Sequence, residues 1–166
     1  SSLILIICGP AGSGKTTLCE RLRTEFPGLE RLVTTTSRAP RPGETDGVDY
    51  HFLSADEFET GIERGAFIEW ARVHGRYYGS RYEHLVAALA EGRDLLLNID
   101  VQGARSFRKQ QYRRPELAGR LHTVFIKPRS MEQLRRRLLA RGSDDEEEIA
   151  RRLRTAEEEI RLADEF

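Results

Sequence analysis

The chain has 166 residues, a length typical of one domain, of which 39% are hydrophobic and 33% charged. Its 27 basic and 27 acidic residues cancel, which argues against the one-signed surface of a nucleic-acid-binding protein. No apolar run approaches the ~20 residues that span a bilayer, and no secretory signal opens the chain, so we expect a cytoplasmic protein that binds neither membrane nor nucleic acid.

The chain begins with a strand and helix pattern that recurs further on. Residues 3–7, LILII, are a continuous apolar run typical of a strand buried on both faces, and apolar residues then recur at every fourth position through 18–26. Residues 95–100 and 121–128 repeat the buried-strand pattern, each before a helix-compatible stretch. This order predicts a three-layer α/β fold with a central parallel sheet.

Residues 34–82 have a different character, because β-branched and aromatic residues there are broken by proline and glycine. The pattern predicts a small, mostly antiparallel insert, which we interpret as a substrate-binding subdomain, with helices near 55–64 and 82–91. The core domain is then expected over residues 1–33 and 83–129.

The C-terminal third is helical and heavily charged. Ser130 and Gln133 have the spacing of a capping box, which predicts a helix that runs up to Gly142. Residues 143–166 predict a second helix with acids in its first turn.

Residues 9–17, GPAGSGKTT, match the Walker A pattern between a buried strand and a helix. The glycines let backbone N–H groups face an anion at the helix N-terminus, and Lys15 adds a positive charge between the β- and γ-phosphates. The Thr16 hydroxyl is a ligand for Mg²⁺ that bridges the same phosphates. The predicted ATP-binding residues are Gly9, Pro10, Ala11, Gly12, Ser13, Gly14, Lys15, Thr16 and Thr17.

Asp100 ends the apolar strand pattern of residues 95–99, the position of a carboxylate that acts at Mg²⁺ with Thr16. The alternative is that Asp100 caps the helix that follows. Both interpretations can hold together.

The Walker A pattern alone leaves GTPases, motor and transport ATPases and small-molecule kinases open. A kinase would need a second anion site for its acceptor. Arg38 and Arg41, stiffened by the prolines of SRAPRPGE, are candidates, and Tyr50 and Tyr78 offer hydroxyl donors to a phosphate. Glu69 interrupts the apolar run AFIEWA, so its carboxylate needs hydrogen-bond donors from the protein or from a ligand.

Five stretches together resemble the guanylate kinases, P-loop nucleoside monophosphate kinases that convert GMP and ATP into GDP and ADP. In order, they are GPAGSGKTT, TTTSRAPRPGETDGVDYHF, FIEWARVHGRYYGS, LLLNIDVQGA and LRRRLLARGSDDEEEIARRL. The resemblance implies that Glu69 accepts hydrogen bonds from the guanine N1–H and amino group, and that Thr34 and Ser80 donate to O6. It also implies a helical lid over residues 130–152, with residues 153–166 returning to the core.

The resemblance implies two sets of site residues. The GMP-binding set is Thr34, Arg38, Arg41, Tyr50, Glu69, Tyr78, Gly79, Ser80, Asn98 and Asp100. The catalytic set is Lys15, Arg38, Arg41, Arg137, Arg141 and Arg152.

The chain departs from the family pattern in two places. The family commonly has an acid where Asn98 stands, so we expect weaker GMP binding. The family's last strand and helix, which approach the adenine, are expected to be missing, which leaves the adenine pocket incomplete. Monomer and homo-oligomer are not distinguished by the sequence.

Two rival functions share this pattern. One is a non-catalytic guanylate-kinase-like module that binds proteins, against which the intact Lys15, Thr16 and Asp100 argue. The other is a related kinase for a phosphorylated sugar, against which Glu69 argues, because a carboxylate there suits a guanine acceptor.

Overall fold

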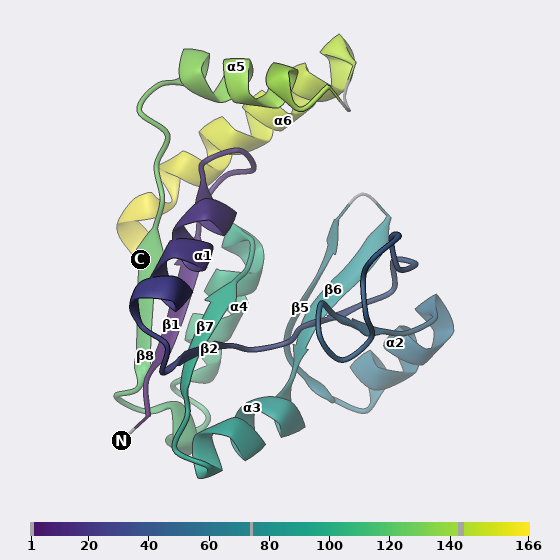
Figure 1. Cartoon of the computed structure of the whole chain (residues 1–166), viewed down its shortest axis with the longest axis vertical. Coiled ribbons are helices and arrows are strands. Elements are labelled where there is room, and N and C mark those ends of the chain that lie inside the picture. The colour runs from purple at the N-terminus through teal and green to yellow at the C-terminus, as the bar shows by residue number, and fades with distance from the viewer. Residues whose placement is uncertain (1, 74, 143–144) are drawn as a thin grey trace.

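Two sheets, the helices that pack on them and a pair of C-terminal helices make up the computed structural model of the chain (Figure 1). The structure describes residues 2–73, 75–142 and 145–166. Residues 143–144, which the sequence places at the start of the last helix, lie outside this description. Among the helices of the described residues, none combines the length and apolar character needed to cross a membrane.

The first sheet is parallel and has the strand order β2-β7-β1-β8. Its central strand β1 is almost fully buried, as its apolar sequence requires. The predicted strands are present with ends shifted by up to three residues, and β2 is a short strand that the sequence analysis missed. The bounds are Ile4–Cys8 for β1, Leu29–Arg31 for β2, Asp94–Asn98 for β7 and Leu121–Phe125 for β8.

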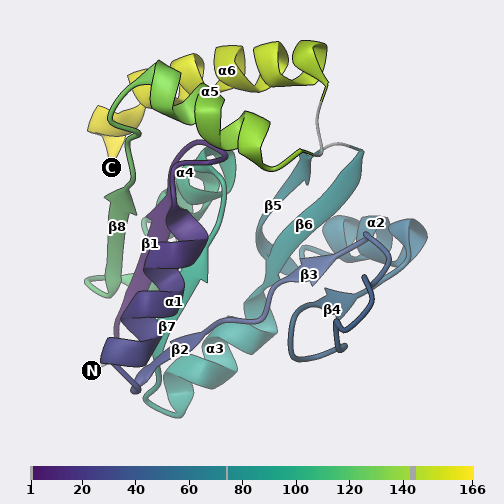
Figure 2. The same cartoon turned by 45° about the horizontal axis from the view of Figure 1, so that its top comes forward.

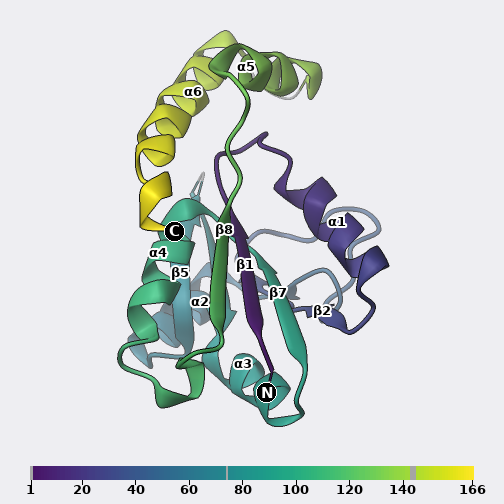
Figure 3. The ribbon, with the colours of Figure 1, turned by 90° about the vertical axis from the view of Figure 1, so that its left-hand side faces the viewer.

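Helices cover both faces of this sheet (Figure 3). On one face α1 (Lys15–Glu25) packs its Cys19 against Ile7 and Leu96. On the other face α3 (Tyr82–Ala90) and α4 (Val101–Gln110) bury the larger apolar cluster, and a 3₁₀ turn at Pro115–Leu117 leads into β8. The predicted three-layer α/β architecture with a central parallel sheet is therefore confirmed.

Strand β8 is not buried on both faces, so that expectation was wrong. Its residues alternate between partly buried and exposed, and Val124 is 41% exposed. The physical reason is its place at the end of the sheet order, where it pairs only with β1 among the described strands. Phe26, the last position of the predicted apolar stripe on the first helix, is also exposed, because α1 ends at Glu25.

The second sheet has the order β4-β3-β6-β5, with antiparallel pairs β3·β6 and β5·β6 and one parallel pair, β3·β4. This confirms the mostly antiparallel insert. Helix α2 packs on the sheet through Phe58, which stacks on Phe67 with ring centroids 4.2 Å apart. The bounds are Thr35–Thr36 for β3, His51–Phe52 for β4, Ala55–Glu63 for α2, Phe67–Val73 for β5 and Arg76–Arg81 for β6.

Helices α5 (Met131–Ala140) and α6 (Glu146–Arg161) lie across the end of the core sheet above the loop that follows β1 (Figure 2). They share a small apolar cluster that includes Leu134 and Ile149. Ser130 caps α5 by accepting from the Gln133 N–H, but the Gln133 side chain accepts from a neighbouring N–H, so the predicted capping box is only half formed. A 3₁₀ turn at Ala163–Glu165 ends the chain.

Candidate functional site

The phosphate loop, residues 9–17, joins β1 to α1. Gly9 has φ 143°, and a Cβ there would lie 2.4 Å from the carbonyl oxygen of Ile126. The close approach of these two backbone segments therefore requires glycine. Gly14, with φ 99°, is the N-cap of α1. No side chain caps this helix within the described residues, and its first turn carries no acid. The first N–H groups of α1 therefore suit an anion.

Lys15 folds back over the loop that it follows. Its Nζ donates hydrogen bonds to the carbonyl oxygens of Gly9 (2.7 Å) and Pro10 (3.0 Å). Burial lowers the pKa of Lys15, whereas the nearby Glu159 and Asp100 raise it. The ammonium is thus held at the loop that the sequence assigns to phosphate.

A cavity of about 300 Å³ lies between the phosphate loop, the start of α4 and helix α6. Lys15, Asp100 and Glu159 all line it, with Gly9 and Ala11 of the loop. Burial, reinforced by Asp100, raises the pKa of Glu159 to about 7. The sequence analysis missed Glu159, because its place among the many acids of α6 carries no local signal.

The three arginines predicted for the lid lie close to the phosphate loop or to the Lys15 cavity. Nη1 of Arg137 donates to the carbonyl oxygens of Gly12 (3.2 Å) and Ser13 (3.3 Å), and Arg141 lines the same groove. Arg152 lines the Lys15 cavity, where its Nε also donates to Glu148 (2.9 Å). All three predicted lid arginines therefore lie on surfaces shared with the phosphate loop.

Asp100 caps α4, since its Oδ1 accepts a hydrogen bond of 2.6 Å from the Gly103 N–H. It also lies near Lys15, whose charge lowers the Asp100 pKa against the stronger raising effect of burial. The helix-capping interpretation is confirmed, and Asp100 also lines the cavity that contains Lys15. The metal role stays a prediction.

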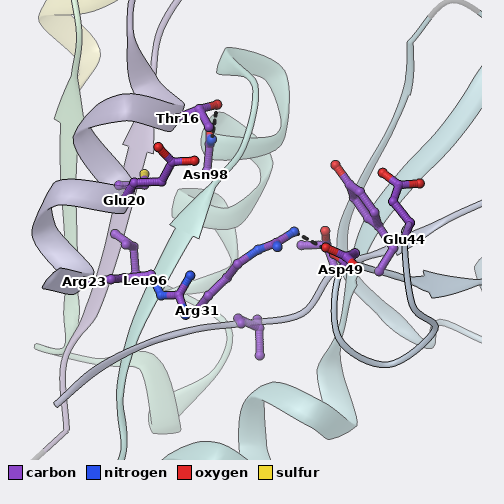
Figure 4. A pocket seen from close by; sticks show the side chains of 12 residues that line it. Thr16, Glu20, Arg23, Arg31, Glu44, Asp49, Leu96 and Asn98 are labelled. Atoms are coloured by element: carbon purple, nitrogen blue, oxygen red, sulfur yellow. Dashed lines mark hydrogen bonds between the residues drawn. The ribbon is translucent and has the colours of Figure 1, made fainter. Parts of the chain in front are cut away.

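The oxygen donors present fit Mg²⁺. The Thr16 hydroxyl accepts a hydrogen bond of 3.3 Å from Asn98 Nδ2 (Figure 4), which leaves it a free lone pair. Asp100 offers a carboxylate. No cluster of three or more His, Cys, Asp or Glu side chains able to hold a metal occurs in the described part of the chain. Mg²⁺ is commonly held by only one or two protein oxygens, and substrate phosphates and water supply its other ligands.

A second cavity, of about 220 Å³, lies between the two sheets and holds most of the predicted GMP-binding residues. Those that line it are Thr34, Tyr50, Glu69, Tyr78, Gly79, Asn98 and Asp100. Asp100 lines this cavity and the Lys15 cavity, so the two lie next to each other.

Glu69 is a buried carboxylate at this cavity, with 5% of its surface exposed. Burial raises the pKa of Glu69 to about 7, and the Ser80 hydroxyl opposes this by donating a hydrogen bond of 2.7 Å to Oε1. Ser80, which the resemblance assigns to guanine O6, is fully buried and bonded to Glu69 instead. Packing explains the glycine at position 79, because a Cβ there would lie 2.9 Å from the Glu69 carbonyl oxygen.

Gly103 is a site residue that the sequence analysis missed. A Cβ at this position would lie 2.7 Å from Glu69 Oε2 and 2.9 Å from Asp100 Oδ1. Its lack of a side chain therefore lets two carboxylates from different subdomains approach the first turn of α4. A glycine three residues after a helix-capping aspartate is a weak signal, because glycine disfavours helices.

Arg38 is engaged by an acid that the sequence analysis also missed. Glu44 receives two hydrogen bonds from the Arg38 guanidinium, at 2.8 and 2.9 Å, and a third of 2.7 Å from the Arg41 N–H. These bonds lower the pKa of Glu44 to about 2 and raise that of Arg38. The Arg38 guanidinium also lies 5.3 Å from the ring centroid of Tyr50. The position of Glu44, three residues after Arg41 in the stretch RPGE, was the sequence signal that could have identified it as a partner of the arginines.

The arginine pair and the carboxylate thus do not share one cavity. Neither Arg38 nor Arg41 lines the Glu69 cavity, but Tyr50 and Tyr78 do, and their rings meet edge to face with centroids 6.2 Å apart. Because Arg38 contacts Tyr50, the tyrosines connect the two halves of the predicted acceptor site.

Comparisons with known proteins agree over the whole chain. The family model described as guanylate kinase matches residues 1–166. The guanylate kinase of Nitratidesulfovibrio vulgaris is 49% identical over 166 residues, which are 100% of this chain and 77% of the relative. The guanylate kinase of Symbiobacterium thermophilum is 45% identical over 159 residues, 96% of this chain and 72% of the relative.

A solved structure gives the same result. The crystal structure of guanylate kinase from Anaplasma phagocytophilum superposes with a TM-score of 0.71 at 30% sequence identity, and the match covers 99% of this chain and 73% of that one. These comparisons give no support to the two rival functions. The chain belongs to the guanylate kinase family.

Proposed function

We propose that this chain transfers the γ-phosphoryl group of ATP to the phosphate of GMP, giving ADP and GDP. The choice of guanine as the acceptor base rests on one observation. The buried Glu69 carboxylate lies at a cavity adjacent to the one that contains Lys15.

Glu69 explains why the acceptor is guanine. Guanine presents an N1–H and an amino group side by side, and an ionised carboxylate accepts from both. Adenine lacks this donor pair, so it leaves the buried carboxylate with the Ser80 hydroxyl but without the two donors that guanine supplies, which is a strong source of discrimination. The hydrogen bond from Ser80 holds the carboxylate in place.

The donor nucleotide is bound by the phosphate loop. The uncapped N–H groups at the start of α1 and the ammonium of Lys15 receive the β- and γ-phosphates. Lys15 exchanges its bonds to the Gly9 and Pro10 carbonyl oxygens for phosphate oxygens. Thr16 and Asp100 are the residues proposed to hold Mg²⁺, which supplies charge neutralisation to the phosphates when it is bound.

The acceptor phosphate is bound by Arg38, Arg41, Tyr50 and Tyr78. Glu44 pre-orders Arg38, and the guanidinium then exchanges part of this ion pair for the GMP phosphate. An acceptor phosphate is already an anion, so transfer in line needs no general base. Catalysis by this chain rests on positioning and on neutralising charge.

The lid completes the site. Arg137, Arg141 and Arg152 already lie beside the phosphate loop or the Lys15 cavity. A modest closure of α5 and α6 brings their charges onto the transferring group, where arginine contributes on the order of 10³ to 10⁵ in rate. The lid and insert boundaries, residues 130–152 and 34–82, remain predictions.

Acceptor specificity in an ADP-release assay tests this function. With ATP and Mg²⁺ present, we expect GMP to stimulate ADP release strongly, and AMP, ribose 5-phosphate and buffer alone to leave it near background. Stimulation by the sugar phosphate in place of GMP would favour the sugar-phosphate kinase. Binding of GMP without any turnover would favour the non-catalytic module.

A further inference from the structure

Arg31 connects the core sheet to the acceptor subdomain. It is the last residue of β2, a core strand, yet its Nη2 donates a hydrogen bond of 2.7 Å to the Asp49 carbonyl oxygen (Figure 4). The bond crosses a cavity of about 300 Å³ that is lined by α1 and β7 on one side and by Tyr50 and Glu44 on the other. Arg31 therefore bridges two parts of the molecule that the cavity separates.

The same guanidinium contacts the ring of Tyr50. The Arg31 Cζ lies 5.5 Å from the Tyr50 ring centroid, and the Arg38 Cζ lies 5.3 Å from it. Guanidinium groups at this distance attract aromatic rings. Tyr50 is thus held by one arginine from the core and by one from the acceptor site.

The clamp loop, residues 44–50, is braced by its own hydrogen bonds. The Thr45 carbonyl oxygen accepts from the N–H groups of Val48 (3.2 Å) and Asp49 (3.0 Å), and Asp49 Oδ2 accepts from the Thr45 N–H (2.7 Å). The Gly47 N–H donates to the Tyr50 carbonyl oxygen at 2.8 Å. A loop with this many internal bonds moves as one piece.

Its two ends are held by different arginines. At one end Glu44 binds the Arg38 guanidinium, and at the other the Asp49 carbonyl oxygen binds Arg31. Because the loop between them is stiff, the position of Arg31 fixes the position of Glu44, and so of Arg38.

We infer that Arg31 is a positioning residue for the acceptor phosphate, which fastens the clamp loop to the core sheet and so orders Tyr50 and Arg38 before GMP binds. The inference rests on the proposed function. Arg31 itself does not contact the substrate. Its contribution is pre-organisation of groups that do, and such ordering is otherwise a cost of binding.

The alternative is that Arg31 only adds positive charge near an anionic substrate. Lysine distinguishes the two, because it keeps the charge but has no planar fork to bind a carbonyl oxygen and stack on a ring at once. The matched control is Glu30, the preceding residue of β2, which pairs with Arg93 at 3.1 Å. Glu30→Ala removes a charge contact of the same strand without touching the clamp loop.

The experiment compares Arg31→Ala, Arg31→Lys and Glu30→Ala in steady-state kinetics. We expect both Arg31 variants to raise the KM for GMP about 5- to 10-fold, as for the loss of one exposed hydrogen bond of ordinary strength, with the KM for ATP changed less than about twofold. Glu30→Ala should match the wild type. In a Tyr50→Leu background, Arg31→Ala should add less than about a twofold further change, since the two act together.

Hydrogen exchange supplies a readout that does not depend on activity. In Arg31→Ala the amides of residues 45–50 should exchange faster, while those of β1 and β7 keep wild-type protection. The inference is overturned if Arg31→Ala keeps the wild-type KM for GMP, if Arg31→Lys restores it fully, or if GMP and ATP are affected equally. A wild-type chain that does not phosphorylate GMP would instead overturn the proposed function.

Discussion

The Ser80 hydroxyl donates a hydrogen bond of 2.7 Å to the Glu69 carboxylate on the neighbouring strand, and both side chains are buried. The two strands, β5 and β6, pair at this point with Glu69 opposite Ser80. The bond occupies one carboxylate oxygen and leaves the group facing the acceptor cavity.

The affinity for GMP should rise with pH. Burial raises the pKa of Glu69 to about 7, and guanine donors bind its ionised form, so binding is strong above pH 7 and weakens as the pH falls through 7. Calorimetry should show a Kd for GMP about tenfold higher at pH 6 than at pH 8.

Glu69→Gln is the control for this pH dependence, because the GMP phosphate itself titrates near pH 6. The variant should bind GMP more weakly than the wild type at pH 8, and it should lose the part of the pH dependence that belongs to the carboxyl group. An identical pH profile in both proteins would show that Glu69 does not titrate in this range.

Gly103→Ala should weaken GMP binding without loss of stability. The new Cβ would lie 2.7 Å from Glu69 Oε2 and 2.9 Å from Asp100 Oδ1, so the Glu69 carboxylate must move away and the Asp100 carboxylate must shift slightly while it keeps its cap hydrogen bond. Alanine favours a helix over glycine by about 1 kcal/mol, so the melting temperature should hold or rise. We expect a several-fold higher Kd for GMP, whereas Gly28→Ala, where a Cβ meets nothing within 4 Å, should leave it unchanged.

Arg38→Ala should reduce kcat/KM for GMP by on the order of 10² to 10³, because one of the two arginines on the acceptor phosphate is lost. The melting temperature should fall by at most a few degrees, since ion pairs of partly exposed groups contribute about 0 to 1 kcal/mol. The KM for ATP should not change. Full turnover with a normal KM for GMP would remove Arg38 from the acceptor site.

Arg137→Ala should impair phosphoryl transfer on the ATP side of the site and leave GMP binding unchanged. Arg137 contacts the Gly12 and Ser13 carbonyl oxygens of the phosphate loop, so its loss should lower kcat by about 10²-fold or more while calorimetry gives the wild-type Kd for GMP. Arg136→Ala is a matched control, because Arg136 is exposed and pairs with Glu132 on the same helix. Equal losses in the two variants would point to helix stability rather than to catalysis.

The features that could be predicted from the sequence are those set by residues close together in the chain. The phosphate loop could be predicted because its strand, its glycines, Lys15 and its helix follow one another within residues 4–25. The arrangement of layers follows from the spacing of apolar runs. Strand β2 was missed because its three residues, Leu-Glu-Arg, carry no strand pattern and are held by pairing with β7.

Features set by distant contacts were not predictable. The burial of β8 depends on which strands lie beside it, and its sequence does not specify that it is at an edge. Gly103 approaches Glu69 only because α4 packs on β5, and Ser80 turns to Glu69 rather than to the cavity because the strands pair in that register. Arg31 and Glu159 are ordinary charged residues by sequence, and the fold brings them to the site.

Calorimetric titration of the protein with GMP, and with AMP as the control, is the direct test of guanine recognition by Glu69, because it separates recognition of the base from catalysis. We expect saturable binding of GMP at pH 8 and binding of AMP at least about 100-fold weaker, since adenine lacks the pair of donors that the buried carboxylate of Glu69 accepts from guanine. Equal affinities for GMP and AMP, or no binding of GMP, would contradict recognition of guanine by Glu69.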